Sequence, residues 1–286
     1  MRAMTNKLLL AIVSCCLACA VMAEVPSGRK NKPRRKITKV VELDATLPVP
    51  DPLPQGLVPQ PMLSPDMVLD QQGISAPVAP LTANSITGID VSHYQGNINW
   101  KEVARSGQAS YVYIKATEGA NLVDNTYFTN LHGARRAGLK VGAYHFYSPT
   151  APVEQQFRNM VSNVNLHDHD LIPIIDVEHR GRSSLMEFQM RLRNFLRLVE
   201  NHYGVQPIIY TSHNFYNKYL SGTFSKYKYM IARYHPDVPV LVDNARFVMW
   251  QYTAKGRMRG ISGDVDRSRF MGNYDLRDIQ LPRRRR

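Results

Sequence analysis

The sequence predicts an α/β fold, a closed barrel of mainly parallel strands, and three observations carry this prediction. From Asn84 to Gly204, short apolar runs alternate with longer amphipathic runs, as in successive β-then-α units. After Gly204, strand-like runs follow one another with only short pieces between them. The part of the chain from Asn84 onward has about 200 residues, which suits one small barrel domain. We therefore expect a barrel whose last third has lost its helices.

The first three strands are short apolar runs with many aromatic and β-branched residues. We expect them at 86–91, 111–116 and 140–147, with helices at 100–105, 124–137 and 152–164. Gly107 and Gly138 follow the first two helices, where glycine readily adopts the left-handed backbone that ends a helix. Pro152 lies in the first turn of the third helix, where its missing N–H costs little.

The fourth strand and the helix after it are the most clearly marked pair. Residues 171–178 begin with an apolar run typical of a strand buried on both faces, as in parallel sheets. The helix begins with Ser184 and Glu187 in a capping-box pattern, repeats apolar residues every three to four positions, and ends at Gly204. Further strands are expected at 207–211, 229–234, 246–253 and 265–270.

A doubly wound open sheet is the alternative fold. It would need a glycine-rich phosphate loop directly after the first strand, and residues 90–94 offer none. The barrel is therefore favoured.

Residues 1–23 are expected to be a secretory signal peptide. Arg2 and Lys7 precede an apolar stretch that ends at Ala23 and is shorter than the ~20 residues of a spanning helix. All three cysteines lie inside it, so cleavage after Ala23 leaves a mature protein without thiol or disulfide. The alternative is a lipoprotein anchored through Cys15, because residues 12–15 loosely resemble a bacterial lipobox.

Residues 24–84 form a basic, proline-rich linker that we expect to be extended and poorly ordered. Eleven of the eighteen prolines fall here, and each removes a backbone donor and fixes φ. The barrel domain is expected at 85–282, followed by a basic tail at 283–286. The formal charge of +13 favours anionic polymers. For an exported bacterial protein, whether periplasmic, cell-surface or secreted, we expect cell-wall glycan rather than nucleic acid, bound by a monomer.

The acids Asp176 and Glu178 are the most informative feature of the chain. They stand two residues apart at the end of the fourth strand, so their side chains point to the same face. The carboxyl ends of the strands are where α/β barrels keep their chemistry. Two acids in one cleft can hold different protonation states, which cleavage of a glycosidic bond requires.

Acids and aromatic residues recur at the other strand ends. Asp90 ends the first strand, and Asp264 and Asp266 mark the last one. Aromatic platforms suit sugar rings, whose faces are apolar. The candidates for substrate binding are Tyr144, Tyr210, Tyr234, Trp250 and Tyr252. Each of these residues could instead be a turn former or a core residue, and barrel closure is what would bring them together around one mouth.

Metal and serine-hydrolase chemistry are not expected. His93, His145 and His179 lie near strand ends, but they lack the spacing of a metal site. His145 is better explained as a buried, hydrogen-bonded side chain. No Gly-x-Ser-x-Gly elbow occurs, and no cofactor is implied.

The motifs of the chain resemble those of the glycoside hydrolase family 25 lysozymes, the Chalaropsis-type N-acetylmuramidases. The resemblance spans about 87–270. It is carried by residues 88–96 (GIDVSHYQG), 113–119 (YIKATEG), 142–146 (GAYHF), 176–178 (DVE), 231–234 (IARY) and 250–252 (WQY).

This resemblance implies a TIM-like (β/α)5(β)3 barrel and hydrolysis of the β-1,4 bond from N-acetylmuramic acid to N-acetylglucosamine in peptidoglycan. It implies that Glu178 is the general acid and that Asp176 stabilises the substrate's acetamido group or the positive charge at the anomeric carbon. Asp90 and Asp266 match the family's other two active-site acids. Ser268 stands where the family usually has Asn, which leaves Asp264 as an alternative to Asp266.

Two other functions compete. A chitinase-type barrel would carry Asp-x-Asp-x-Glu on the fourth strand, and Ile174 stands at the position of its first acid. A non-catalytic barrel that only binds cell-wall glycan is the alternative from another class, and retention of Asp90, Asp176 and Glu178 together speaks against it. The spacing of Asp176 and Glu178, roughly 6.6 Å along a strand, is compatible with either a retaining or an inverting mechanism.

Overall fold

The computed structural model describes residues 86–282. The predicted signal peptide, the predicted linker and the predicted basic tail all lie outside the described residues. In the described part, no helix is long and apolar enough to cross a membrane.

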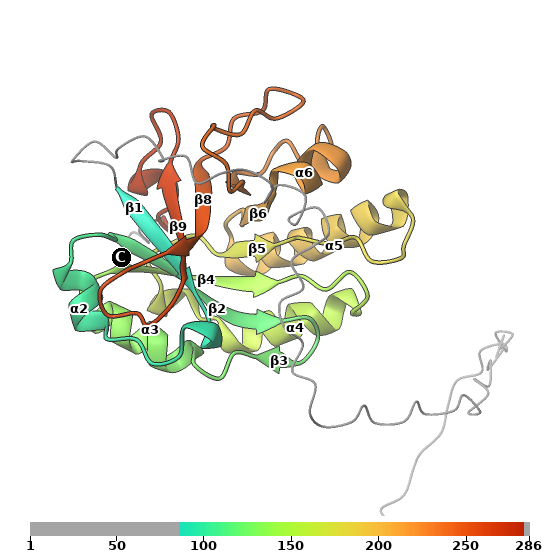
Figure 1. Cartoon of the computed structure of the whole chain (residues 1–286). Helices are drawn as coiled ribbons and strands as arrows, with labels where there is room; N and C mark the ends of the chain where they lie inside the picture. Colours follow the sequence, from blue (N-terminus) through green and yellow to red (C-terminus); the bar gives the residue numbers. More distant parts are fainter. Residues whose placement is uncertain (1–85, 283–286) are drawn as a thin grey trace, which may run out of the picture. The chain divides into compact units, whose positions relative to one another are not determined.

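Eight strands close into a barrel, as predicted (Figure 1). They are β1 (Thr87–Val91), β2 (Tyr111–Glu118), β4 (Lys140–Phe146), β5 (Ile174–Asp176), β6 (Ile208–Ser212), β7 (Tyr229–Ala232), β8 (Met249–Gly256) and β9 (Val265–Phe270). Neighbouring strands are parallel except at β9, which runs antiparallel to both β8 and β1. The parallel pairing of β1 with β2 completes the ring. The short strand β3 (Leu122–Val123) pairs only with the end of β2, and the sequence pattern did not predict it.

Helices follow the strands in the first part of the barrel and become short after β6 (Figure 1). They are α2 (Trp100–Arg105), α3 (Tyr127–Arg136), α4 (Val153–Asn163), α5 (Leu185–Tyr203) and α6 (His213–Phe215), which continues into the π-helix η4 (Tyr216–Leu220). Single 3-10 turns occur at η2 (His93–Gln95), η3 (Leu166–Asp168) and η5 (Leu276–Asp278). Within residues 86–282, no α-helix follows β7, which agrees with the predicted loss of helices in the last third.

The bounds of one strand and of one helix differ from the prediction for local reasons. β5 covers only Ile174–Asp176, because Pro173 has no N–H for the ladder and Leu171 forms an isolated bridge with Gln280. The helix expected from Asp124 begins at Tyr127. The Asp124 carboxylate accepts hydrogen bonds from the backbone and hydroxyl of Thr126, and these bonds hold a turn before the helix.

Because successive side chains of each strand point to opposite faces, the apolar residues of the barrel form two separate clusters. Residues such as Ile89, Val112 and Ile175 point outward and pack under the helices. Residues such as Tyr111 and Tyr113 point inward and fill the barrel below its mouth. A Cβ added at Gly142 would lie 2.3 Å from the Tyr113 ring, so glycine makes room for the aromatic filling. Because the lower barrel is filled, the open space lies at the carboxyl ends of the strands.

Candidate active site

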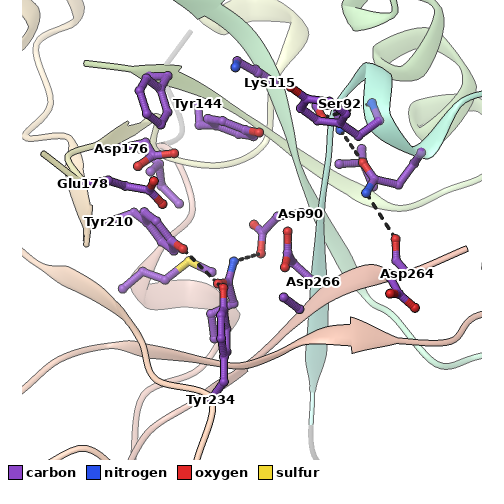
Figure 2. Close-up of a pocket in the computed structure, with 18 residues that line it drawn as sticks. Asp90, Ser92, Lys115, Tyr144, Asp176, Glu178, Tyr210, Tyr234, Asp264 and Asp266 are labelled. Carbon is purple, nitrogen blue, oxygen red and sulfur yellow. Dashed lines mark hydrogen bonds between the residues drawn. The ribbon is translucent and has the colours of Figure 1, made fainter. Parts of the chain in front are cut away.

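A cavity opens at the carboxyl ends of the barrel strands. Every strand of the ring contributes at least one residue to its lining. The acids all belong to β1, β5, β9 and their ends (Figure 2). The lining residues are Asp90, Val91, Ser92, Tyr94, Gln95, Lys115, Tyr144, Phe146, Ile174, Asp176, Glu178, Tyr210, Met230, Tyr234, Gln251, Ala254, Asp264 and Asp266.

Strand β5 delivers Asp176 and Glu178 to the same cavity, as their spacing predicts (Figure 2). Between them, Val177 points outward into the core under the helices. The backbone here is held from both sides: Tyr147 N donates to Asp176 O at 2.8 Å, and Val177 N donates to Tyr210 O at 2.9 Å. The two carboxyl groups therefore stand on a fixed strand end.

Asp90 and Asp266 face the same cavity from neighbouring strands. They are direct partners in the register of β1 and β9. A hydrogen-bond network starts at Asp90, whose Oδ2 accepts from Gln251 Nε2 at 3.2 Å. The Oε1 of Gln251 accepts from the hydroxyls of Tyr210 at 2.9 Å and Tyr234 at 2.8 Å (Figure 2). One amide thus ties three strand ends together across the mouth.

The carboxyl groups of the cavity have raised pKa values. Burial and the Glu178 charge raise the pKa of Asp176 well above its ordinary value. Burial and the Asp266 charge raise the pKa of Glu178 to about 7. Burial and the same Asp266 charge raise the pKa of Asp90 to about 8. Burial and Asp264 raise the pKa of Asp266 to about 7. The cavity therefore retains protons near neutral pH, as a general acid must.

Lys115 is the one cation among the described residues that line the cavity. Its Nζ lies 2.6 Å from Glu118 Oε2 and 5.2 Å from the centroid of the Phe146 ring. Its charge lowers the pKa of both Asp176 and Glu178, which limits the effect of burial on them. A single ammonium group cannot neutralise five acids, so the cavity keeps a marked acidic character.

One buried side-chain polar atom of the cavity has no hydrogen-bond partner within the described part of the chain. Oδ1 of Asp176 is buried and accepts no hydrogen bond there. A buried carboxylate oxygen without a donor is costly, so a bound molecule that offers an N–H or O–H group would be stabilised at this point.

The structure brings three of the five predicted sugar platforms to the cavity. Tyr144, Tyr210 and Tyr234 line it. Trp250 and Tyr252 do not: both rings pack in the outer core, and the Trp250 ring is fully buried, with its Nε1 donating to Arg233 O. The assignment of Trp250 and Tyr252 to substrate contact is therefore corrected. On β8 the inward residue is Gln251, so its two neighbours point outward.

The polar residues of β9 and of the loop before it lie at two different depths in the barrel. Asp266 and Asp264 both line the cavity, and the Asp264 carboxylate pairs with Arg257 Nη2 at 3.1 Å. Ser268 lies deeper in the barrel, fully buried, with its hydroxyl 3.1 Å from the Tyr111 hydroxyl. The departure from the family pattern at Ser268 thus alters the barrel filling below the cavity rather than its lining.

The three histidines have structural partners, and that of His179 is the Phe146 ring, with ring centroids 5.7 Å apart. His93 Nδ1 lies 2.7 Å from Asp124 Oδ2. His145 is fully buried between the side chains of Thr117 and Gln156, as the sequence indicated. None of the three lines the cavity. Among residues 86–282, no group of three His, Cys, Asp or Glu side chains is arranged to hold a metal ion.

Sequence reasoning missed Gln251, Lys115 and Tyr94 as residues of the cavity. Gln251 could have been found from the two-residue period of β8, once the inward face of that strand was known. Lys115 follows the inward residues Tyr111 and Tyr113 on β2 by the same period. Tyr94 lies on a turn beyond β1, where no strand period applies.

Comparison with known proteins agrees with this geometry. Residues 89–261 match the family Glycosyl hydrolases family 25. YegX of Escherichia coli K12 is 36% identical over 195 residues, which cover 67% of this chain and 71% of YegX. Lysozyme M1 of Streptomyces globisporus is 33% identical over 222 residues, which cover 71% of this chain and 75% of that lysozyme.

The fold agrees as well. The solved structure of a family 25 glycosyl hydrolase from Bacillus anthracis matches with a TM-score of 0.63 at 29% identity, covering 70% of this chain and 96% of that chain. The motifs, the barrel with its acidic mouth, and these matches lead to one conclusion: the chain belongs to family 25 of the glycosyl hydrolases.

Proposed function

We propose that this protein is a lysozyme that hydrolyses the β-1,4 bond between N-acetylmuramic acid and N-acetylglucosamine in peptidoglycan. The observation that carries the proposal is the placement of Asp176 and Glu178 side by side in one cavity with raised pKa values. The similarity to lysozyme M1 supports the same substrate class.

Glu178 acts as the general acid in this proposal. It donates its proton to the oxygen of the leaving sugar while the bond to the anomeric carbon breaks. A pKa raised to about 7 keeps the group protonated in mildly acidic and neutral surroundings. Burial and the neighbouring acids supply this shift without any change of fold.

Asp176 acts as the ionised partner. Its unsatisfied Oδ1 suits the N–H of the substrate's 2-acetamido group, and this hydrogen bond would favour the charged carboxylate. An acetamido group held in this way attacks the anomeric carbon through its carbonyl oxygen while the bond to the leaving sugar breaks. Water, which gives a proton back to Glu178, then attacks the anomeric carbon from the other face and opens the resulting ring, so the product retains its configuration. Asp90 and Asp266 complete the ring of acids, and the charge of Asp266 adds to burial in raising the pKa of Glu178.

The aromatic rings of the cavity position the sugar. Tyr144, Tyr210 and Tyr234 offer apolar faces, and hydrogen bonds to Gln251 fix the hydroxyls of Tyr210 and Tyr234. Their distribution around the mouth supports a glycan lying across the barrel end.

We also propose that residues 1–23 are a signal peptide, that residues 24–84 are a linker, and that the protein is exported to the cell wall as a monomer without cofactor. Edman sequencing of the exported protein would locate the cleavage site.

The decisive experiment analyses muropeptides released from purified peptidoglycan by mass spectrometry. Wild type should release fragments with new reducing ends on N-acetylmuramic acid. Glu178→Gln should reduce the rate by roughly 100- to 10,000-fold, the range of general acid catalysis. Glu154→Gln, which changes an exposed acid in the first turn of α4, is the matched control and should cleave normally.

The same experiment separates the alternative, a barrel that binds glycan without cutting it. Binding of wild type to peptidoglycan with no reducing ends would establish that alternative. New ends on N-acetylglucosamine would assign the opposite bond, and full activity of Glu178→Gln would remove that residue from its role.

A further inference from the structure

The turn after β1 projects an aromatic ring at the rim of the cavity. Tyr94 lies in η2 and lines the same cavity as Asp176 and Glu178, yet its side chain remains 45% exposed. The mechanism proposed above assigns it no role. A single exposed aromatic residue is ordinary on a protein surface. Tyr94 differs from such a residue because it lies at the mouth of the candidate active site and because contacts with three parts of the chain fix its backbone.

The turn is fixed first by its own side chains. Ser92 Oγ accepts a hydrogen bond from Tyr94 N at 3.3 Å, and Ser92 N donates to Gln95 Oε1 at 2.9 Å. Ser92 Oγ also accepts from the backbone N of Gln95, which completes a capping box around the single turn of η2. The backbone that carries Tyr94 is therefore ordered before any ligand binds.

Two further contacts anchor the turn to distant parts of the chain. Asp124 Oδ2 lies 3.0 Å from His93 N, which donates to it, and 2.7 Å from His93 Nδ1. Gln95 Nε2 donates to Asp264 O, on the β8–β9 connection, at 3.2 Å. The His93 ring in turn lies under the Tyr94 ring, with centroids 4.0 Å apart. The aromatic face is thus preorganised, which lowers the entropy cost of binding.

The place of Tyr94 in the barrel suits a second sugar. Around the closed ring, β1 stands opposite β6, which carries Tyr210, and β5 with its acids lies between them on one side. A glycan that crosses the mouth past Asp176 and Glu178 would therefore meet Tyr210 with one unit and Tyr94 with another. Tyr210 is 8% exposed and Tyr94 45%, so Tyr94 belongs to the open end of this path.

We propose that Tyr94, held by His93 and Asp124, is the stacking platform of a separate sugar subsite that binds a hexosamine ring away from the cleaved bond. The ligand is the apolar face of a pyranose in the glycan chain. This inference rests on the proposed function, because the chain must be a substrate for the path across the mouth to matter. The subsite adds affinity for long glycans and takes no part in the bond cleavage itself.

The first test compares substrates of different length. Tetrasaccharide and octasaccharide glycans, prepared from peptidoglycan with stem peptides removed, serve as probes. Wild type should show a higher kcat/KM for the octasaccharide. Tyr94→Ala should reduce that preference by about tenfold, mostly through KM, because a ring-sized apolar contact is lost. Tyr94→Trp should keep it. Equal losses on both substrates, or no loss, would overturn the subsite.

The second test measures binding without catalysis. In the Glu178→Gln background, Tyr94→Ala should weaken octasaccharide binding about tenfold by calorimetry. His93→Gln, which removes the ring beneath Tyr94, should weaken it in the same direction, while Tyr94→Trp restores it. Unchanged binding in Tyr94→Ala would refute the inference. Cleavage of the glycan by Glu178→Gln would remove Glu178 from the role of general acid, and absence of cleavage by wild type would refute the proposed function. Loss of octasaccharide binding in Tyr94→Ala alone bears only on the subsite.

A control variant tests whether loss of any exposed aromatic ring, rather than loss of the subsite, weakens binding. Phe128 on α3 is 49% exposed and does not line the cavity. Phe128→Ala should bind and cleave like wild type. Thermal unfolding of Tyr94→Ala should match wild type, since the ring is half in solvent. A lower Tm together with weaker binding to both glycans would identify a structural role for Tyr94 instead.

Discussion

Gln251 Nε2 donates a hydrogen bond of 3.2 Å to Asp90 Oδ2, from β8 past the intervening strand β9 to β1. The same side chain accepts from Tyr210 and Tyr234. An amide is suited to this place because it donates to an acid and accepts from hydroxyls at once. The position of the acids and of the aromatic rings in the cavity is therefore coupled through one residue.

Replacement of Gln251 by methionine should damage both activity and stability. The variant keeps the volume but leaves the Tyr210 and Tyr234 hydroxyls and Asp90 without their shared partner. Unsatisfied buried groups cost about 1–3 kcal/mol each, so we expect a loss of about 2 kcal/mol in urea unfolding and at least a tenfold fall in kcat/KM. Gln189→Met, which removes a part-buried amide outside the cavity, is the control for activity. Wild-type rates for Gln251→Met would show that the network is dispensable.

The glycine at position 142 should be required by the aromatic filling of the barrel. Gly142→Ala places a Cβ 2.3 Å from the Tyr113 ring, and overpacking of this kind typically costs about 1–3 kcal/mol. We expect a lower free energy of unfolding with the catalytic acids unaltered. Tyr113→Leu should relieve the clash, so the double variant should lose less than the sum of the two single losses. Additive losses in a double-mutant cycle would contradict a direct contact.

Much of the fold follows from local patterns in the sequence. The α5 helix has its cap at Ser184 and its left-handed end at Gly204, as the pattern predicts. Strand period alone predicts that Asp176 and Glu178 share a face. Where the period was applied without knowledge of the inward face, as at Trp250 and Tyr252, the assignment failed. Alternation shows which residues go together but not which side is inside.

Contacts between residues far apart in the chain could not be predicted from local sequence patterns. Gln95 and Asp264 are 169 positions apart, and only barrel closure brings them together. The short strand β3 has only two residues, both exposed, which is too short for a two-residue period to reveal it. The hydrogen bonds of Gln251 likewise depend on the order of strands around the ring rather than on any local spacing.

The stability of the protein should fall as pH rises from 6.5 to 8.5. Asp90, Asp266 and Glu178 have pKa values raised to about 8, 7 and 7, so the stability linked to their protonated forms is lost as pH passes these values. Burial lowers the pKa of His145 to about 4, which opposes this trend only below pH 6.5, where the unfolded chain binds the proton. The slope above pH 6.5 therefore belongs to the acids.

Thermal unfolding at pH 6.5, 7.5 and 8.5 measures this slope. Wild type should show a falling Tm across the series. Asp90→Asn removes the group whose pKa, about 8, is the highest of these three and should flatten the decline. Asp237→Asn, which changes an exposed acid outside the cavity, should not. A Tm that rises with pH in wild type would contradict the protonated state of the acid cluster.

The alkaline limit of catalysis should depend on Asp266. Because burial and the Asp266 charge raise the pKa of Glu178 to about 7, kcat/KM should decline above that pH as the general acid loses its proton. The protonated fraction falls about tenfold for each further pH unit. Asp266→Asn removes a negative charge, which lowers the pKa of Glu178 and moves the decline to lower pH. Asp237→Asn should leave it in place.

The informative quantity is the position of the alkaline limb rather than the rate at any one pH. Asp266→Asn also alters the cavity, so its maximal rate is free to change without bearing on the electrostatic argument. A limb at the same pH in wild type and Asp266→Asn would mean that Asp266 does not act on Glu178 through its charge. A limb displaced to higher pH would reverse the sign of the interaction and assign the titration to another acid of the cavity.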